Sequence, residues 1–255
     1  MAVPRIRLDA LLVERGLAAS RERARALVLA GQVRVAGLAT AKPGTMVDPG
    51  AEVALDVPDH PYVSRGGLKL AHALDVFGIA VEGRLALDIG ASTGGFTDVL
   101  LRRGARLVVA LDVGHGQIDW RLRTDPRVVV IERANARSLT PDGLPAEARR
   151  LDVVTIDVSF ISLRVILPVV PALLAPHADV VTLVKPQFEA GRREVGKGGI
   201  VKDPAVHERV LREVREEAAR LGLTVCAECD SPITGAEGNR EYLVHLQARE
   251  AAHVE

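Results

Sequence analysis

The stretch LALDIGASTGGFT, residues 85–97, decides the fold predicted for this chain. Apolar residues lead to Asp88, a glycine-rich turn begins at Gly90, and residues 98–101 start an apolar pattern with helical spacing. In a doubly wound α/β sheet a parallel strand passes into a helix in this way, and ligands bind at the carboxyl ends of the strands. The stretch therefore predicts a ligand-binding turn, with a purely structural tight turn as the alternative.

The glycine spacing indicates which ligand such a turn would hold. Gly90, Gly94 and Gly95 form Gly-x3-Gly-Gly, which differs from the G-x-G-x-x-G of dinucleotide binders. Glycines let a ligand approach the backbone, and a helix N-terminus offers free N–H groups. Asp88, close ahead of the turn, suits a ligand with an ammonium group, such as the methionine part of S-adenosylmethionine. An NAD oxidoreductase is disfavoured by this spacing.

Composition is that of an ordinary globular protein, with 255 residues, 48% hydrophobic and 26% charged. This length accommodates one large domain, or a small domain and a medium one. The longest nearly uncharged run, residues 165–176, is interrupted by prolines and too short to span a bilayer, so it predicts a buried helix. Because no apolar segment follows Met1, we expect no secretory signal and no membrane association, and we predict a cytoplasmic protein.

The two cysteines, Cys226 and Cys229, form a C-x-x-C motif within a stretch that alternates like a strand. A zinc site needs two more ligands, and a redox pair normally opens a helix. We therefore expect buried structural thiols on opposite faces of a strand, and no metal site.

Charge is concentrated at the start of the chain although the net charge is zero. The first 35 residues carry seven arginines against three acidic residues, a net +4, which predicts an anionic partner such as nucleic acid. Residues 8–13 begin a helix that Gly16 ends, and Ser20 caps a second helix over residues 21–30. Short strands follow at 31–37 and 53–57.

Residues 7–37, RLDALLVERGLAASRERARALVLAGQVRVAG, resemble the ribosomal protein S-four-like RNA-binding domain, whose hallmark is a basic helix followed by G-x-V-x-V-x-G. The resemblance implies contact with structured RNA through its shape and phosphates. We expect this domain over residues 1–59, a stiff proline-containing linker at 60–63 and a second domain over 64–255. The candidate RNA-binding residues, each also explicable as a solvated charge, are Arg5, Arg7, Arg21, Arg25, Arg34, Arg65, Arg192 and Arg193.

Beyond the turn, predicted strands and helices alternate. We expect further strands at 106–111, 128–132, 151–157 and 180–185, and helices at 69–77 and 204–221. Two last strands, at 223–229 and 241–247, follow one another without a helix and predict an antiparallel hairpin at the sheet edge. An α/β fold of seven strands with such a hairpin is the class I (Rossmann-like) methyltransferase sheet, which favours a methyl donor over a nicotinamide.

Charged residues end several of these strands. Asp112 ends the second strand about twenty residues beyond the turn, where an acidic residue binds ribose hydroxyls. Asp157 and Lys185 each end an apolar strand, so both should face the ligand crevice. A lysine–carboxylate pair there can orient and deprotonate a weak nucleophile. Lys69 and Glu241 are expected at the same edge, although each charge taken singly is explained by solvent exposure.

Five motifs in this half resemble the TlyA family of ribosomal RNA 2′-O-methyltransferases, also named haemolysins: VSRGGLKL (63–70), DIGASTGGFT (88–97), TIDVSFISL (155–163), LVKPQFE (183–189) and GNREYLVHL (238–246). The catalytic half is similar to FtsJ-type enzymes, which use a Lys-Asp-Lys-Glu tetrad. By motif the tetrad falls on Lys69, Asp157, Lys185 and Glu241. Thr93-Gly94 stands where FtsJ-type enzymes often have proline, as in other TlyA proteins.

The resemblance implies methyl transfer from S-adenosylmethionine to the 2′-hydroxyl of cytidine ribose in 16S and/or 23S ribosomal RNA within ribosomal subunits. Lys185 would act as the base or orient the hydroxyl, Asp157 would hold Lys185, and Lys69 with Glu241 would position the ribose and phosphate. The implied cofactor residues are Asp88, Gly90, Ser92, Gly94, Gly95, Phe96, Asp112 and Asn135. Two alternatives stay open: a membrane-disrupting haemolysin, and an RNA-binding protein with a non-catalytic methyltransferase scaffold.

Overall fold

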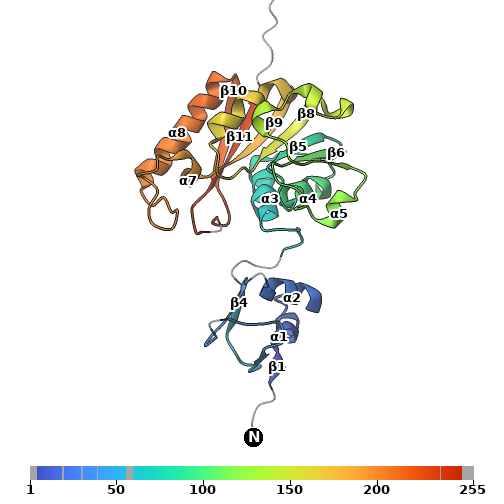
Figure 1. Ribbon diagram of the computed structural model, residues 1–255, viewed down its shortest axis with the longest axis vertical. Helices are drawn as coiled ribbons and strands as arrows, with labels where there is room; N and C mark the ends of the chain where they lie inside the picture. Colours follow the sequence, from blue (N-terminus) through green and yellow to red (C-terminus); the bar gives the residue numbers. More distant parts are fainter. Residues whose placement is uncertain are drawn as a thin grey trace, which may run out of the picture. The chain divides into compact units, whose positions relative to one another are not determined.

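The computed structural model describes residues 5–18, 20–29, 31–38, 40–55, 60–235 and 237–248. These residues form two compact units that divide between Pro61 and Tyr62 (Figure 1). The division falls inside the predicted linker, residues 60–63. Residues 56–59, at the end of the predicted N-terminal domain, lie outside the described part. Each unit is described by itself.

The N-terminal unit is a pair of helices with two small antiparallel sheets. Its elements are β1 (Ile6–Arg7), α1 (Leu8–Glu14), α2 (Arg21–Leu29), β2 (Val33–Val35), β3 (Met46–Val47) and β4 (Val53–Leu55). Strand β1 pairs with β3, and β2 pairs with β4. The Ser20 hydroxyl accepts a hydrogen bond from the Arg23 N–H at 3.1 Å, which is the predicted helix cap. Leu8, Leu12 and Leu27 bury the facing sides of the two helices.

The C-terminal unit is built on one seven-stranded sheet in the order β10-β11-β9-β8-β5-β6-β7 (Figure 1). The strands are β5 (Leu85–Ile89), β6 (Leu107–Leu111), β7 (Val128–Ile131), β8 (Leu151–Ile156), β9 (Leu174–Val184), β10 (Leu223–Asp230) and β11 (Tyr242–Ala248). Strands β5 to β9 are parallel, and β11 runs antiparallel to both β9 and β10. The predicted methyltransferase sheet and its terminal hairpin are confirmed.

Helices cover both faces of this sheet. They are α3 (Gly66–Phe77), α4 (Gly95–Arg102), α5 (Trp120–Arg123), α6 (Leu163–Ile166), α7 (Pro186–Glu189) and α8 (Pro204–Arg220), with 3-10 turns at Ala136–Ser138, Pro141–Gly143, Ala146–Ala148, Leu167–Val169 and Pro171–Leu173. Leu85, Leu87 and Ile89 pack into the core with α6 and α8, whereas Ala86 packs with α3 and α4. Successive side chains of a strand point to opposite faces, so both faces of the parallel strands must be apolar.

The turn between β5 and α4 depends on glycine at two positions. Gly90 has φ +88°, and a Cβ there would lie 2.4 Å from the carbonyl oxygen of Asp157. Gly94 has φ +95°, and a Cβ there would lie 2.2 Å from Leu122 Cδ1. Glycine has no Cβ and therefore tolerates both the left-handed backbone and these close contacts. At Gly90 this lets the turn lie directly against the end of β8, and at Gly94 it makes room for Leu122.

Two predictions from the sequence are wrong. The buried helix expected over residues 165–176 is instead α6, two 3-10 turns and the start of β9 at Leu174, because Pro168 and Pro171 cannot donate the N–H groups that a continuous helix needs. Cys226 is exposed and Cys229 half-buried, so the thiols are not core residues. A β-bulge between Val225 and Ala227 breaks the strand alternation on which that expectation depended.

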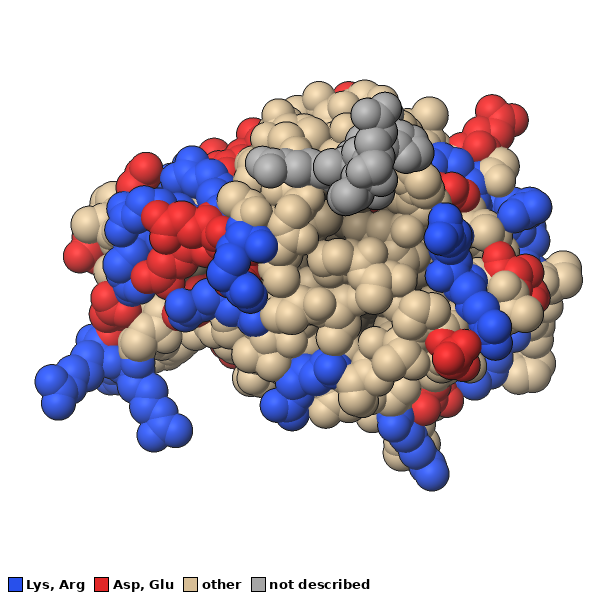
Figure 2. Space-filling model, turned by 90° about the horizontal axis from the view of Figure 1, so that it is seen from above, with Lys and Arg blue, Asp and Glu red and all other residues tan. Residues whose placement is uncertain are grey.

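Neither a membrane span nor a metal cluster is evident in the described part of the chain. No helix there is both long and apolar enough to cross a bilayer. The same residues contain no group of three or more His, Cys, Asp or Glu side chains placed to hold a metal ion. On the face drawn in Figure 2, basic and acidic side chains lie next to one another around an uncharged middle, so that face has no large patch of a single sign.

The close packing of the turn predicts the effect of Gly94→Ala. The new methyl group would collide with Leu122, and alanine would have to adopt the left-handed backbone conformation that the turn requires. Together these two effects should lower the free energy of unfolding by about 2–5 kcal/mol. Chemical denaturation measures this change. Gly116→Ala is the control, because Gly116 also has positive φ (+69°) but has open space around its Cβ position, so it should cost only about 1–2 kcal/mol. Equal losses in the two variants would contradict the packing explanation.

Candidate active site

Two adjoining cavities open at the carboxyl ends of the parallel strands. The first has a volume of about 400 Å³ and is lined by residues of the β5–α4 turn, α3 and the segments that follow β8 and β9. The second, about 460 Å³, is lined by the ends of β5, β6 and β8 and by Asn135. Gly90, Ser92, Asp157, Ser159 and Phe160 line both cavities. The two therefore meet at the turn and at the end of β8.

All four residues of the predicted tetrad line the first cavity, arranged as two ion pairs. Lys185 Nζ lies 2.6 Å from Asp157 Oδ1 and also donates a hydrogen bond to Ser159 Oγ at 2.9 Å. Lys69 Nζ donates to Glu241 Oε2 at 2.5 Å. Lys69, Lys185 and Glu241 are each less than a tenth exposed, whereas Asp157 is half-buried. The arrangement holds two lysine ammonium groups in fixed positions beside an open cavity.

Sheet order explains why these residues meet. Strands β8 and β9 are parallel neighbours, so Asp157 and Lys185, which directly follow them, reach the same edge. Strand β11 pairs antiparallel with β9 in a register that places Tyr242 opposite Val184. One further step of that register brings Glu241 opposite Lys185. Lys69 lies on helix α3, which packs against α4, the helix that follows the turn.

The second cavity has the features expected of a nucleoside site. Asp112 accepts hydrogen bonds from the N–H groups of Ser92 at 2.8 Å and Gly114 at 2.7 Å, so its carboxylate is fixed at the end of β6. Asn135 also lines this cavity, and its Oδ1 accepts a hydrogen bond from the Arg137 N–H. Ser92 has φ +48°, which turns its backbone toward Asp112. Gly95 and Phe96, also predicted to bind the cofactor, line the first cavity.

Asp88, in strand β5, and Gly94, in the turn, are not among the residues that line the two cavities. Asp88 is completely buried and accepts hydrogen bonds from the hydroxyls of Thr97 at 2.7 Å and Thr155 at 3.1 Å. Burial raises the pKa of this carboxyl from its ordinary value to about 7, against the lowering effect of the two threonine hydroxyls. In this position Asp88 joins the start of α4 to strands β5 and β8.

An aromatic pair at the cavity mouth was missed by sequence reasoning. Phe160 is 90% exposed and has φ +63°, and its ring centroid lies 4.9 Å from that of Phe188. Both rings line the first cavity, with Lys185 Nζ 6.0 Å from the centre of the Phe188 ring. A large exposed aromatic in a left-handed conformation is costly, which marks a binding surface. The available signal was the position of each phenylalanine, three residues after a tetrad residue.

The arginines predicted to bind RNA have different surroundings. Arg7 and Arg21 both pair with the buried carboxylate of Asp9, at 2.7 and 3.2 Å, and the hydrogen bond from Arg7 is the main cause that holds the pKa of Asp9 below its usual value. Arg65 lines the first cavity. The remaining five, Arg5, Arg25, Arg34, Arg192 and Arg193, have exposed side chains.

The fold and the paired charges of this site define a class I methyltransferase. The model of the family described as FtsJ-like methyltransferase matches residues 62–248, and that of the S4 domain matches residues 6–53. The 16S/23S rRNA (cytidine-2′-O)-methyltransferase TlyA of Mycobacterium tuberculosis is 50% identical, over 96% of this chain and 91% of its own length. Hemolysin A of Brachyspira hyodysenteriae is 42% identical, over 94% of this chain and 99% of its own.

A solved S-adenosylmethionine dependent methyltransferase from Mesorhizobium loti shares the fold, with a TM-score of 0.51 at 15% identity over 69% of this chain and 96% of that one. The chain belongs to the TlyA family, whose catalytic half is an FtsJ-like methyltransferase.

The raised pKa of Asp88 predicts a pH-dependent stability. The folded state holds a proton on this carboxyl that the unfolded state releases near pH 3.8, so the free energy of unfolding should fall as pH rises between about 4 and 7. Asparagine is neutral at every pH. The free energy of unfolding of Asp88→Asn should therefore fall less steeply than that of the wild type, by up to about 4 kcal/mol over this range. Chemical denaturation at several pH values tests this. Asp75→Asn, at an exposed ion pair with Arg103, is the control and should show the same pH dependence as the wild type. If stability changes with pH in the same way in Asp88→Asn and in the wild type, this explanation is wrong.

Proposed function

We propose that this chain transfers a methyl group from S-adenosylmethionine to the 2′-hydroxyl of cytidine ribose in 16S and/or 23S ribosomal RNA. The observation that carries this proposal is the joint placement of the two ion pairs, Lys185–Asp157 and Lys69–Glu241, in one cavity that opens onto a second, nucleoside-sized cavity. The name of the relative that matches 96% of this chain, the 16S/23S rRNA (cytidine-2′-O)-methyltransferase TlyA, supports the substrate and the modified atom.

The residues of the second cavity fit the adenosyl group. The Asp112 carboxylate uses one acceptor position on each oxygen for backbone N–H groups, which leaves further lone pairs for ribose hydroxyls. Leu111, Val113 and Ile166 supply apolar surface, and Asn135 can pair with the edge of a base. When bound, S-adenosylmethionine supplies a methyl group on a positively charged sulfur. The methionine part would extend along Gly90 and Ser92 toward the first cavity.

Lys185 is placed to act on the attacking hydroxyl. Its Nζ is paired with Asp157 and hydrogen-bonded to Ser159, and Lys185 lines the first cavity, so the amine is already in position when a substrate enters. To act as the base, Lys185 must first lose a proton to solvent and become the neutral amine. A 2′-hydroxyl aligned there would then pass its proton to Nζ as its oxygen bonds to the methyl carbon and the bond from methyl to sulfur breaks, and Asp157 would stabilise the ammonium that results. Holding the two reacting atoms in line accounts for much of the acceleration that such a site can give.

Lys69 and Glu241 would position the nucleotide from the other side of the cavity. Lys69 offers an ammonium group to a phosphate oxygen, and Glu241, its partner, can accept a hydrogen bond from a ribose hydroxyl. The exposed pair Phe160 and Phe188 would hold an unstacked base by its faces, since a ribose inside a helix cannot otherwise enter the cavity.

The basic loop 191–202 is held in place by hydrogen bonds, which supports a role in binding the RNA backbone. The buried Asn239 accepts a hydrogen bond from the Val201 N–H at 3.1 Å and donates one to the Gly199 carbonyl at 2.9 Å. Arg192 and Arg193 on this loop are exposed and would meet phosphates. With ribosomal RNA as substrate, we place the protein in the cytoplasm.

The proposal predicts the behaviour of Lys185→Ala. With S-adenosylmethionine labelled at the methyl group and isolated 30S, 50S and 70S particles, the wild type should label ribosomal RNA, and the variant should label it at least about 100-fold more slowly. The Kd for S-adenosylmethionine should change little, because Lys185 acts on the hydroxyl. Which particle accepts label identifies the subunit, and nuclease digestion identifies a 2′-O-methylcytidine.

Arg212→Ala is the matched control, since it removes a cation from an ion pair on α8 that lies outside both cavities. It should keep the wild-type rate. Tight binding of S-adenosylmethionine without label on any particle would contradict catalysis and favour the scaffold hypothesis. Leakage of dye from liposomes caused by the pure protein without RNA would favour the haemolysin hypothesis.

A further inference from the structure

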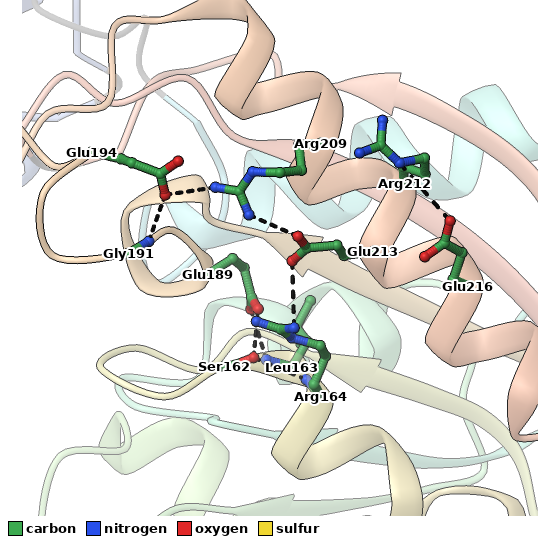
Figure 3. Close-up of polar contacts among 10 residues, drawn as sticks. All are labelled: Ser162, Leu163, Arg164, Glu189, Gly191, Glu194, Arg209, Arg212, Glu213 and Glu216. Atoms are coloured by element: carbon green, nitrogen blue, oxygen red, sulfur yellow. Dashed lines mark hydrogen bonds and ion pairs between the residues drawn. The ribbon is translucent and has the colours of Figure 1, made fainter.

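Glu189, the last residue of the motif LVKPQFE, is a buried carboxylate that the proposed chemistry does not use. It ends helix α7 and is 7% exposed. Its Oε1 accepts a hydrogen bond from the Leu163 N–H at 2.7 Å, and its Oε2 accepts one from the Ser162 hydroxyl at 2.5 Å (Figure 3). Both oxygens are therefore engaged by the segment that begins helix α6.

These two bonds join the segments that carry the catalytic groups. The segment after β8, residues 157–163, contains Asp157, Ser159 and Phe160, and the segment after β9, residues 185–189, contains Lys185 and Phe188. At the cavity the segments meet through the Lys185 ammonium and through the two phenylalanine rings. Behind the cavity they meet through Glu189. A bound substrate can replace the contacts that line the cavity. The hydrogen bonds of Glu189 are buried in the interior, where a substrate does not reach them.

The character of the Glu189 site indicates a geometric function. Its two hydrogen-bond partners are neutral, and burial is the main cause that raises the pKa of the carboxyl. Burying a carboxylate is costly, and an apolar side chain would fill the same space at lower cost but could not hold a backbone N–H and a hydroxyl in register. The backbone between Asp157 and Ser162 includes the left-handed Phe160, a conformation that persists only when its surroundings enforce it.

The surrounding ion pairs extend this connection to helix α8. The carboxylate of Glu213 on α8 forms ion pairs with two arginines. Its Oε2 lies 3.4 Å from Nη1 of Arg164, the residue after Leu163, and its Oε1 lies 2.7 Å from Nη1 of Arg209. Arg209 in turn reaches Glu194 at 2.6 Å, whose carboxylate also accepts from the Gly191 N–H at 2.8 Å (Figure 3). These outer pairs are partly exposed, so we assign the positional control to the two inner bonds of Glu189.

We propose that Glu189 is a positioning residue for methyl transfer: its two hydrogen bonds fix the segment after β8 to the segment after β9, and so set Ser159 and Phe160 relative to Lys185 and Phe188. This inference rests on the proposed function and adds to it a residue that touches neither substrate nor cofactor. The strength of the effect follows from alignment, since a displacement of about 1 Å at reacting groups can cost on the order of 100-fold in rate.

Four variants test the assignment through single-turnover methyl transfer at saturating S-adenosylmethionine and ribosomal particles. Glu189→Ala should lower the rate at least about tenfold while the Kd for S-adenosylmethionine stays within about twofold. Glu189→Gln should retain at least about half of the rate, because its carbonyl oxygen can accept from Leu163 and its amide can donate to Ser162. Ser162→Ala should lose less than Glu189→Ala. Glu216→Ala, at an exposed pair with Arg212 on α8, is the control and should match the wild type.

Hydrogen–deuterium exchange separates this proposal from the proposed function. Amides of residues 158–163 should exchange faster in Glu189→Ala, and remain protected in Glu189→Gln and Glu216→Ala, whether or not a substrate has been found. Unchanged protection in Glu189→Ala would overturn the fixation of the segment. Faster exchange with an undiminished methyl-transfer rate would overturn its role in the reaction, as would a Glu189→Gln variant as slow as Glu189→Ala. If the wild type labels no RNA, the proposed function fails, and the exchange result alone decides whether Glu189 fixes the two segments.

Discussion

The ion pair between Lys185 and Asp157 is the interaction on which the site depends. Its side chains are only 10% and 20% exposed, so bringing them out of water carries a cost that close contact and further hydrogen bonds must offset. Ser159 provides one such bond. Removing one partner of a buried pair typically costs about 3–5 kcal/mol, because the other charge is left without compensation. The fold must therefore bring the ends of β8 and β9 together accurately, and most features around the site serve that requirement.

Three constraints produce that accuracy. Parallel pairing sets β8 beside β9, the absence of a side chain at Gly90 lets the β5 turn lie against the Asp157 carbonyl, and Glu189 joins the two following segments from behind. Each acts on backbone rather than on the charged groups. Lysine and aspartate side chains are flexible when exposed, so a rigid backbone beneath them is what gives a fixed ammonium in the cavity. The second ion pair, Lys69–Glu241, is held in the same way between α3 and the start of β11.

Several elements could be predicted from sequence because their signals are local. The capping serine Ser20, the helix expected over residues 204–221, and the alternation of apolar strands with helices all appear in the structure at nearly the expected residues. The wrong predictions came from the same kind of pattern. An apolar run with prolines fits a helix or a strand by composition, and here β9 begins at Leu174 within it. A β-bulge at Cys226 leaves no mark in the order of residues.

By itself the sequence determined which residue types stand at the ends of strands and helices, and hence the class of sheet, the acidic and basic groups at its edge and the motifs of the family. Only the tertiary structure decided which of those groups meet. Lys69 and Glu241 are 172 residues apart, and their contact depends on strand order and register, which are properties of the whole sheet. The same holds for the buried position of Asp88, the exposed pair of phenylalanines and the two bonds of Glu189, because burial and contact arise from packing between distant segments.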